Sequence, residues 1–66
     1  MPTNEECKKA AEVMVAAGYD EVKPHMVKQV FNRWNKKVFV AVVSDGNAMV
    51  VYTPEWDDDP IKFVVF

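Results

Sequence analysis

The chain lacks most of the residue types from which small domains build reactive centres. Its 66 residues include one cysteine, one histidine and two glycines. Because the lone Cys7 cannot form an internal disulfide, we expect the protein to work in a reducing, cytoplasmic environment. Two isolated glycines exclude a glycine-rich phosphate-binding loop, and no serine lies in the elbow motif of a hydrolase.

Catalytic and metal-binding residue sets are missing for the same reason. Cys7 and His25 fall on different predicted helices, and the spacing of zinc ligands is absent. The only histidine stands outside any Ser-His-Asp pattern. The run Asp57-Asp58-Asp59 lacks the spaced ligands and the glycine of a calcium loop. We therefore expect no enzymatic activity, no metal and no cofactor.

Long apolar runs are also absent. No stretch approaches the ~20 residues that a membrane-spanning helix requires, and the N-terminus carries no signal-peptide pattern, so we expect no membrane association. Half of the residues are hydrophobic, which excludes a disordered chain. We expect residues 1–66 to form a single small domain, which buries only ~60% of its unfolded surface and is marginally stable.

Charge, by contrast, is plentiful and segregated along the chain. The segment from Lys23 to Lys37 has five basic residues and no acidic one. Residues 1–22 carry five carboxylates against two lysines, and residues 38–66 carry five carboxylates against one lysine. The net charge of −2 therefore conceals a cationic middle and an anionic end, and each could meet a different partner.

Local signals predict two helices in the first half of the chain. Thr3 and Glu6 have the spacing of a capping box, and the apolar stripe behind them continues to Gly18, which can end a helix in the left-handed conformation. A second helix is predicted from Pro24 to Asn35. Its apolar residues cluster on one side, and its other side is polar and basic, with His25, Lys28, Gln29, Asn32, Arg33 and Lys36.

Three strands are predicted in the second half. Residues 38–43 and 48–53 flank an Asp45-Gly46 turn, a strong hairpin signal because both central positions of a type I′ turn need positive φ. An acidic connection then leads to a third strand, Ile61–Phe66. We therefore expect an α+β domain, with two N-terminal helices packed on a three-stranded antiparallel meander in the order α-α-β-β-β. The expected hairpin register pairs Val43 with Ala48, Ala41 with Val50, and Phe39 with Tyr52.

Both faces of the predicted hairpin are apolar. One face carries Phe39, Ala41 and Val43, and the other carries Val38, Val40 and Val42, together with their partners on the second strand. Two helices cover only one face of such a sheet, so a second copy of the chain or a partner protein would cover the other. Alternatively, the helices wrap both sides, or twist and small size hide most of the second face.

The cationic segment and the hairpin together resemble a known DNA-binding family. The stretch from Val27 to Lys37 runs directly into a hairpin that closes in Thr53-Pro54-Glu55. Over residues 10–55 this pattern is similar to the recognition helix and wing of winged-helix DNA-binding domains. The resemblance implies that Gln29, Asn32 and Arg33 contact base edges, and that Lys28, Lys36 and Lys37 contact phosphates. The alternative is an ordinary solvated helix face.

The acidic connection is a second candidate surface. It reads Glu55-Trp56-Asp57-Asp58-Asp59 and lies between two prolines that restrict it. Carboxylates along such a loop can imitate phosphates, and Trp56 would be the anchor of a protein interface. Asp45, at the hairpin tip, joins the predicted partner-binding residues. The alternative is that Trp56 folds onto the core while the aspartates keep the loop soluble.

The negative net charge favours protein binding, because DNA-binding domains of this size are usually basic. We therefore predict a small non-enzymatic protein that regulates or inhibits a protein partner. A phage or mobile-element inhibitor that uses an acidic, DNA-mimicking surface against a host nucleic-acid-binding complex would fit this description. The alternative is a winged-helix-like transcriptional regulator that binds DNA through the basic face of helix 24–35. Both the protein-binding and the DNA-binding predictions leave open a homodimer through the second apolar face of the sheet.

Overall fold

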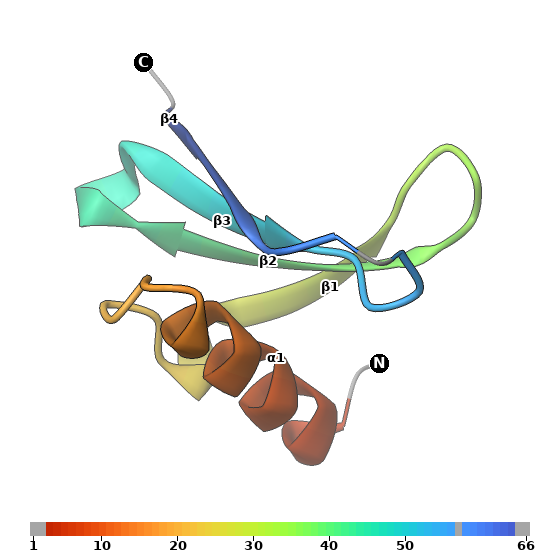
Figure 1. The fold of residues 1–66 in the computed structure, drawn as a ribbon, viewed down its shortest axis with the longest axis horizontal. Helices are drawn as coiled ribbons and strands as arrows, with labels where there is room; N and C mark the ends of the chain where they lie inside the picture. Colours follow the sequence, from red (N-terminus) through yellow and green to blue (C-terminus); the bar gives the residue numbers. More distant parts are fainter. Residues whose placement is uncertain (1–2, 57, 65–66) are drawn as a thin grey trace.

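The computed structural model describes residues 3–56 and 58–64, which form one helix and a four-stranded antiparallel sheet. The strands follow one another in the order β1-β2-β3-β4, so each is paired with its neighbour in the chain. The helix lies against one face of the sheet (Figure 1). The elements are α1 (Asn4–Ala16), η1 (Pro24–Met26), β1 (Val27–Phe31), β2 (Lys37–Val43), η2 (Ser44–Gly46), β3 (Ala48–Tyr52) and β4 (Ile61–Val64).

Helix α1 begins and ends where its local signals predict. The Glu6 N–H donates to Thr3 Oγ1 over 3.1 Å, and the Thr3 N–H donates to Glu6 Oε1 over 3.3 Å, which completes the capping box. Gly18 has a φ of 105° just beyond the helix. The Tyr19 N–H then donates to the Met14 carbonyl over 3.1 Å, the bond of a Schellman motif. The predicted first helix is confirmed.

The predicted second helix is wrong, and with it the order α-α-β-β-β. Residues 24–26 form a single 3-10 turn, and Val27–Phe31 is an edge strand paired with β2. Met26, Val27, Val30 and Phe31 fit a helical period, but Val27, Val30 and Phe31 also favour a strand. Pairing with β2 satisfies the backbone of this segment on one side and places Val27 in the core. Pairing with β2 therefore outweighs the helical spacing of the apolar residues in this segment.

The hairpin register is confirmed. Val43 is opposite Ala48, Ala41 is opposite Val50, and Phe39 is opposite Tyr52. Asp45 and Gly46 both have positive φ, at 56° and 90°, and the Asn47 N–H donates to the Ser44 carbonyl over 3.1 Å. The third predicted strand is also present, as β4, although Phe66 lies outside the described residues.

The core lies between α1 and the face of the sheet that α1 covers. Met14 is fully buried from the helix and Val50 from the sheet, and the Tyr19 hydroxyl donates to the Pro60 carbonyl over 3.3 Å. No helix in the described part of the chain is long and apolar enough to cross a membrane. The buried core residues are Ala10, Ala11, Met14, Val22, Val27, Phe39, Ala41, Val43, Ala48 and Val50.

Candidate functional site

The sheet has a second face that α1 does not cover, which we call the open face. Side chains alternate between the two faces of a strand. Val40, the residues paired with it on the neighbouring strands, and every second residue from these therefore share this face. Four of its apolar side chains are exposed, and Val42 retains 55% of its surface. The open face comprises Lys28, Val30, Val38, Val40, Val42, Met49, Val51, Ile61 and Phe63.

Two loops meet at one end of the sheet and bring two tryptophans together. The β1–β2 loop and the β3–β4 loop share this end, and η2 lies at the other (Figure 1). The rings of Trp34 and Trp56 make an edge contact, with their centroids 5.4 Å apart. The Arg33 guanidinium lies 5.2 Å from the centroid of the Trp34 ring. We call this group the tryptophan end: Arg33, Trp34, Lys36, Glu55, Trp56, Asp58 and Asp59.

Asn32 holds the β1–β2 loop in the shape that presents Trp34. Its Oδ1 accepts hydrogen bonds from the Trp34 N–H over 2.9 Å and from the Lys36 N–H over 3.0 Å. Asn35 adopts a φ of 59°, which asparagine tolerates better than most residues. Trp34 therefore remains 60% exposed at a defined position, whereas Trp56 is 38% exposed.

A hollow of about 180 Å³ lies where the tryptophan end joins the open face. Its apolar part is formed by Trp56 and by residues of β3 and β4, and its acidic part by Asp58 and Asp59. Neither aspartate makes an ion pair within residues 3–56 and 58–64. The site therefore combines an apolar floor with two available carboxylates. The lining residues are Val51, Thr53, Trp56, Asp58, Asp59, Ile61 and Phe63.

The predicted acidic surface is only partly assembled. Trp56, Asp58 and Asp59 lie together, and the Glu55 carboxylate is 3.9 Å from the Lys36 ammonium. Asp45 lies in η2, at the opposite end of the sheet, so it does not belong to this surface (Figure 1). Asp57 lies outside the described residues.

The predicted basic helix face does not form, because its residues lie on a strand and a loop. Lys28 is on the open face, and Gln29 is on the face that α1 covers. Asn32 is a loop-organising residue and not a free contact group. Lys37 lies 3.6 Å from the Glu6 carboxylate, and Lys36 has Glu55 beside it. The basic residues are thus dispersed, and two of them are partly neutralised.

The Glu6 carboxylate is more acidic in the folded chain than an ordinary glutamate. Its hydrogen bond from the Thr3 backbone N–H, and then the nearby Lys37 ammonium, lower the pKa of Glu6 below its ordinary value of 4.5. This carboxylate joins the start of α1 to the start of β2.

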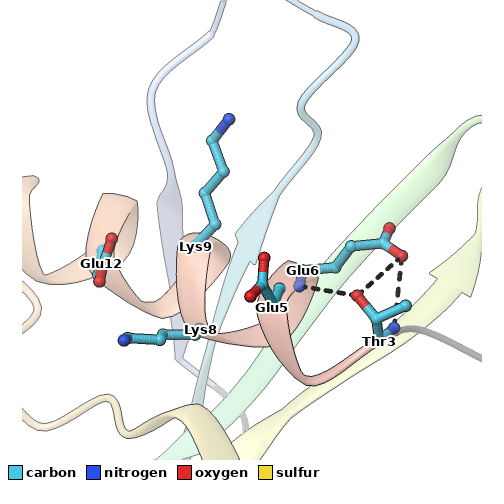
Figure 2. A pocket seen from close by; sticks show the side chains of 6 residues that line it. All are labelled: Thr3, Glu5, Glu6, Lys8, Lys9 and Glu12. Atoms are coloured by element: carbon cyan, nitrogen blue, oxygen red, sulfur yellow. Dashed lines mark hydrogen bonds between the residues drawn. The ribbon is translucent and has the colours of Figure 1, made fainter.

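A second hollow, of about 580 Å³, lies on the exposed side of α1 (Figure 2). The capping box borders it, and Lys8 and Lys9 extend away from one another. Its alternating charges are typical of a solvated helix side.

Cys7 and His25, which the sequence places apart, line a further hollow of about 350 Å³. The described structure records no hydrogen bond between them, and the Cys7 thiol instead donates to the Val27 carbonyl over 3.7 Å. Across residues 3–56 and 58–64, no three His, Cys, Asp or Glu side chains converge as metal ligands.

Sequence reasoning missed Trp34, which it placed on the apolar side of a helix. The neighbouring Asn32 and Asn35 were the available signal, because asparagine favours turns.

Comparison with protein-family models, with curated proteins and with solved structures gave no significant match.

Proposed function

We propose that the protein is a small, non-catalytic, cytoplasmic protein that regulates or inhibits a protein partner, which it contacts through the tryptophan end. The observation that carries this proposal is the Trp34–Trp56 pair, exposed beside Asp58 and Asp59. Tryptophan and arginine are the residue types that most often dominate protein-binding energies. Here Arg33 and Trp34 are stacked and Asn32 restrains their loop, so little freedom is lost on binding.

The charge of the tryptophan end indicates the chemistry of the partner. Asp58 and Asp59 border an apolar hollow, which suits a partner side chain with an apolar stem and a basic head. A nucleic-acid-binding surface is rich in such lysines and arginines. We therefore propose that the protein inhibits its partner by placing carboxylates where the partner's surface would bind phosphates. A phage or mobile-element protein would act in this way.

DNA binding is the alternative, and the stacked pair of Arg33 and Trp34 is what favours it, since bases stack on exposed tryptophan. Residues 24–35 form no recognition helix, so the winged-helix arrangement lacks its central element. The carboxylates of Glu55 and Asp58 would also repel a phosphate backbone near Trp34.

Affinity capture from the cells that make this protein tests the proposal. We expect a protein partner that persists after nuclease treatment. Trp34→Ala is the most informative variant because that side chain is the more exposed of the pair, and we expect it to weaken capture about tenfold or more. Asp58→Asn should also weaken capture, whereas Asp45→Asn, the same charge change at the opposite end, should not.

Two outcomes would contradict the proposal. The first is a partner that both Trp34→Ala and Asp58→Asn retain at full affinity. The second is capture that disappears with nuclease, together with anisotropy-detected binding of labelled DNA that Arg33→Glu abolishes and Asp58→Asn strengthens. The second result would favour the DNA-binding alternative. Circular dichroism of each variant checks that the fold is unchanged.

A further inference from the structure

The open face is apolar between its edges, although Val38 is already buried within the chain, and it has a charge of opposite sign at each edge. Among the strand residues that the structure describes, one charged side chain lies on the open face, Lys28 on the edge strand β1; Lys37 and Lys62 lie in register with the other face. Asp59 lies at the other edge, two residues before Ile61 at the start of β4, and borders the same hollow as Ile61 and Phe63. Pro60 between them is buried, as expected if Asp59 continues the outward alternation of Ile61 and Phe63.

Both charges are available for an intermolecular contact. Neither Lys28 nor Asp59 takes part in an ion pair in the part of the chain that the structure describes, although Lys36, Lys37 and Lys62 each do. The apolar centre between them includes the exposed Val42 and the half-buried Val40, Met49 and Val51. An apolar centre with charges at its rim is the usual composition of a protein interface.

We propose that a second copy of this chain covers the open face, which gives a two-fold symmetric sandwich of two four-stranded sheets. The charge pattern is complementary to itself, as a symmetric interface between identical chains requires. A two-fold axis parallel to the strands, between β2 and β3, places β1 of one copy opposite β4 of the other. Val40 then faces Val51, and Val42 faces Met49, in both halves of the interface.

The same axis brings the edge charges together. Lys28 of each copy lies across from the β4 edge of the other, offset from Asp59 by two residues, which is about 7 Å along a strand. Packed sheets lie about 10 Å apart, so an extended lysine side chain reaches this carboxylate. A two-fold axis perpendicular to the strands would instead place Lys28 near Lys28 and Asp59 near Asp59. The charges therefore select the parallel axis.

This assembly has a consequence for the rest of the molecule. An axis parallel to the strands keeps corresponding strand ends together, so both tryptophan ends lie at the same end of the dimer. The inference shares Asp59 and the hollow with the proposed partner site, but it requires no partner protein, because it concerns contacts between two copies of this chain. In the dimer the second copy covers the apolar floor of the hollow and pairs with Asp59, so the partner contact of each copy is confined to the exposed groups of the tryptophan end, chiefly Trp34 and Asp58. If both proposals hold, these groups of the two copies lie at the same end of the dimer.

Light scattering after size-exclusion chromatography tests the dimer. The unaltered chain should have a mass of roughly twice its 7.5 kDa at micromolar concentration. Val42→Lys should give a monomer with an unchanged circular dichroism spectrum, because Val42 is exposed in the single chain. Val15→Lys is the matched control: Val15 is 39% exposed on α1, away from the open face, and its replacement should leave the dimer intact.

A charge exchange then tests the arrangement. Lys28→Asp and Asp59→Lys should each weaken self-association at least about tenfold, because each places like charges together at two points. Mixing the two variants should restore association, since each edge contact between the different chains then joins one acidic and one basic side chain. The proposal is overturned by a monomeric unaltered chain, by a Val42→Lys variant that stays dimeric, or by a mixture that associates no more tightly than its components.

Discussion

At the scale of single residues, Asn32 has the clearest structural role outside the core. One side-chain oxygen accepts two backbone hydrogen bonds and so sets the path of the β1–β2 loop. Its Nδ2 is buried and has no hydrogen-bond partner among the described residues. The hydrogen bonds to Oδ1 therefore stabilise the folded loop, whereas the buried Nδ2 without a partner destabilises it.

Asn32→Asp and Asn32→Ala should consequently differ. The alanine leaves the Trp34 and Lys36 N–H groups without their acceptor, and we expect the free energy of unfolding to fall by about 1–2 kcal/mol. The aspartate keeps the acceptor but puts a second carboxylate oxygen where the buried Nδ2 stands, so stability should fall less than in the alanine variant. Urea denaturation measures stability, and the near-ultraviolet circular dichroism of the tryptophan pair reports loop geometry. Equal losses in both variants would contradict this role.

At the scale of elements, the start of α1 is held to the start of β2 by one carboxylate. Glu6 closes the capping box and lies 3.6 Å from the Lys37 ammonium. Because the folded state lowers the pKa of Glu6 below 4.5, ionised Glu6 favours the folded state. This contribution is present above the unfolded pKa and is lost as pH falls through the lowered, folded value.

Replacing Glu6 with Gln should therefore reduce the loss of folding stability that occurs as the pH is lowered. The glutamine can still bond to the Thr3 N–H, so the substitution isolates the charge. We expect the melting temperature of the unaltered chain to exceed that of Glu6→Gln at neutral pH, and the difference to shrink below about pH 4.5. Glu5→Gln is the control, because the described structure records no side-chain bond for Glu5. Matching pH profiles for the two variants would refute the role of Glu6.

At the scale of the whole molecule, one helix and one sheet make only two layers. A chain of 66 residues has no further element with which to cover the open face, within the residues that the structure describes. Small domains bury a low fraction of their surface and are marginally stable, so the burial of a second sheet face would contribute appreciably. Self-association and folding stability should then be linked.

Thermal unfolding should accordingly depend on protein concentration. If the native state is a dimer, each tenfold increase in concentration favours it by about 1.4 kcal/mol, which raises the melting temperature by several degrees. The Val42→Lys variant should melt at a lower temperature that does not change with concentration. Circular dichroism melts over a hundredfold range of concentration measure both. A concentration-independent melting temperature for the unaltered chain would count against the dimer.

Some features of this protein follow from its sequence by itself. Thr3, Glu6 and Gly18 determine where α1 begins and ends, because each acts on backbone groups a few residues away. Asp45 and Gly46 determine the β2–β3 register, because only a few residue types adopt positive φ at both turn positions. The alternation of Val38–Val43 also indicates that both faces of the sheet are apolar. These are short-range effects, and each can be predicted from a few adjacent residues.

Tertiary structure decided the rest. Residues 27–31 satisfy a helical and a strand pattern, and pairing with β2 selects the strand. The meeting of Trp34 with Trp56, and the separation of Asp45 from Asp59, depend on which loops share an end of the sheet. The opposite edge positions of Lys28 and Asp59 follow from strand order. These features depend on residues far apart in the sequence, and only the packing of the whole chain brings such residues together or holds them apart.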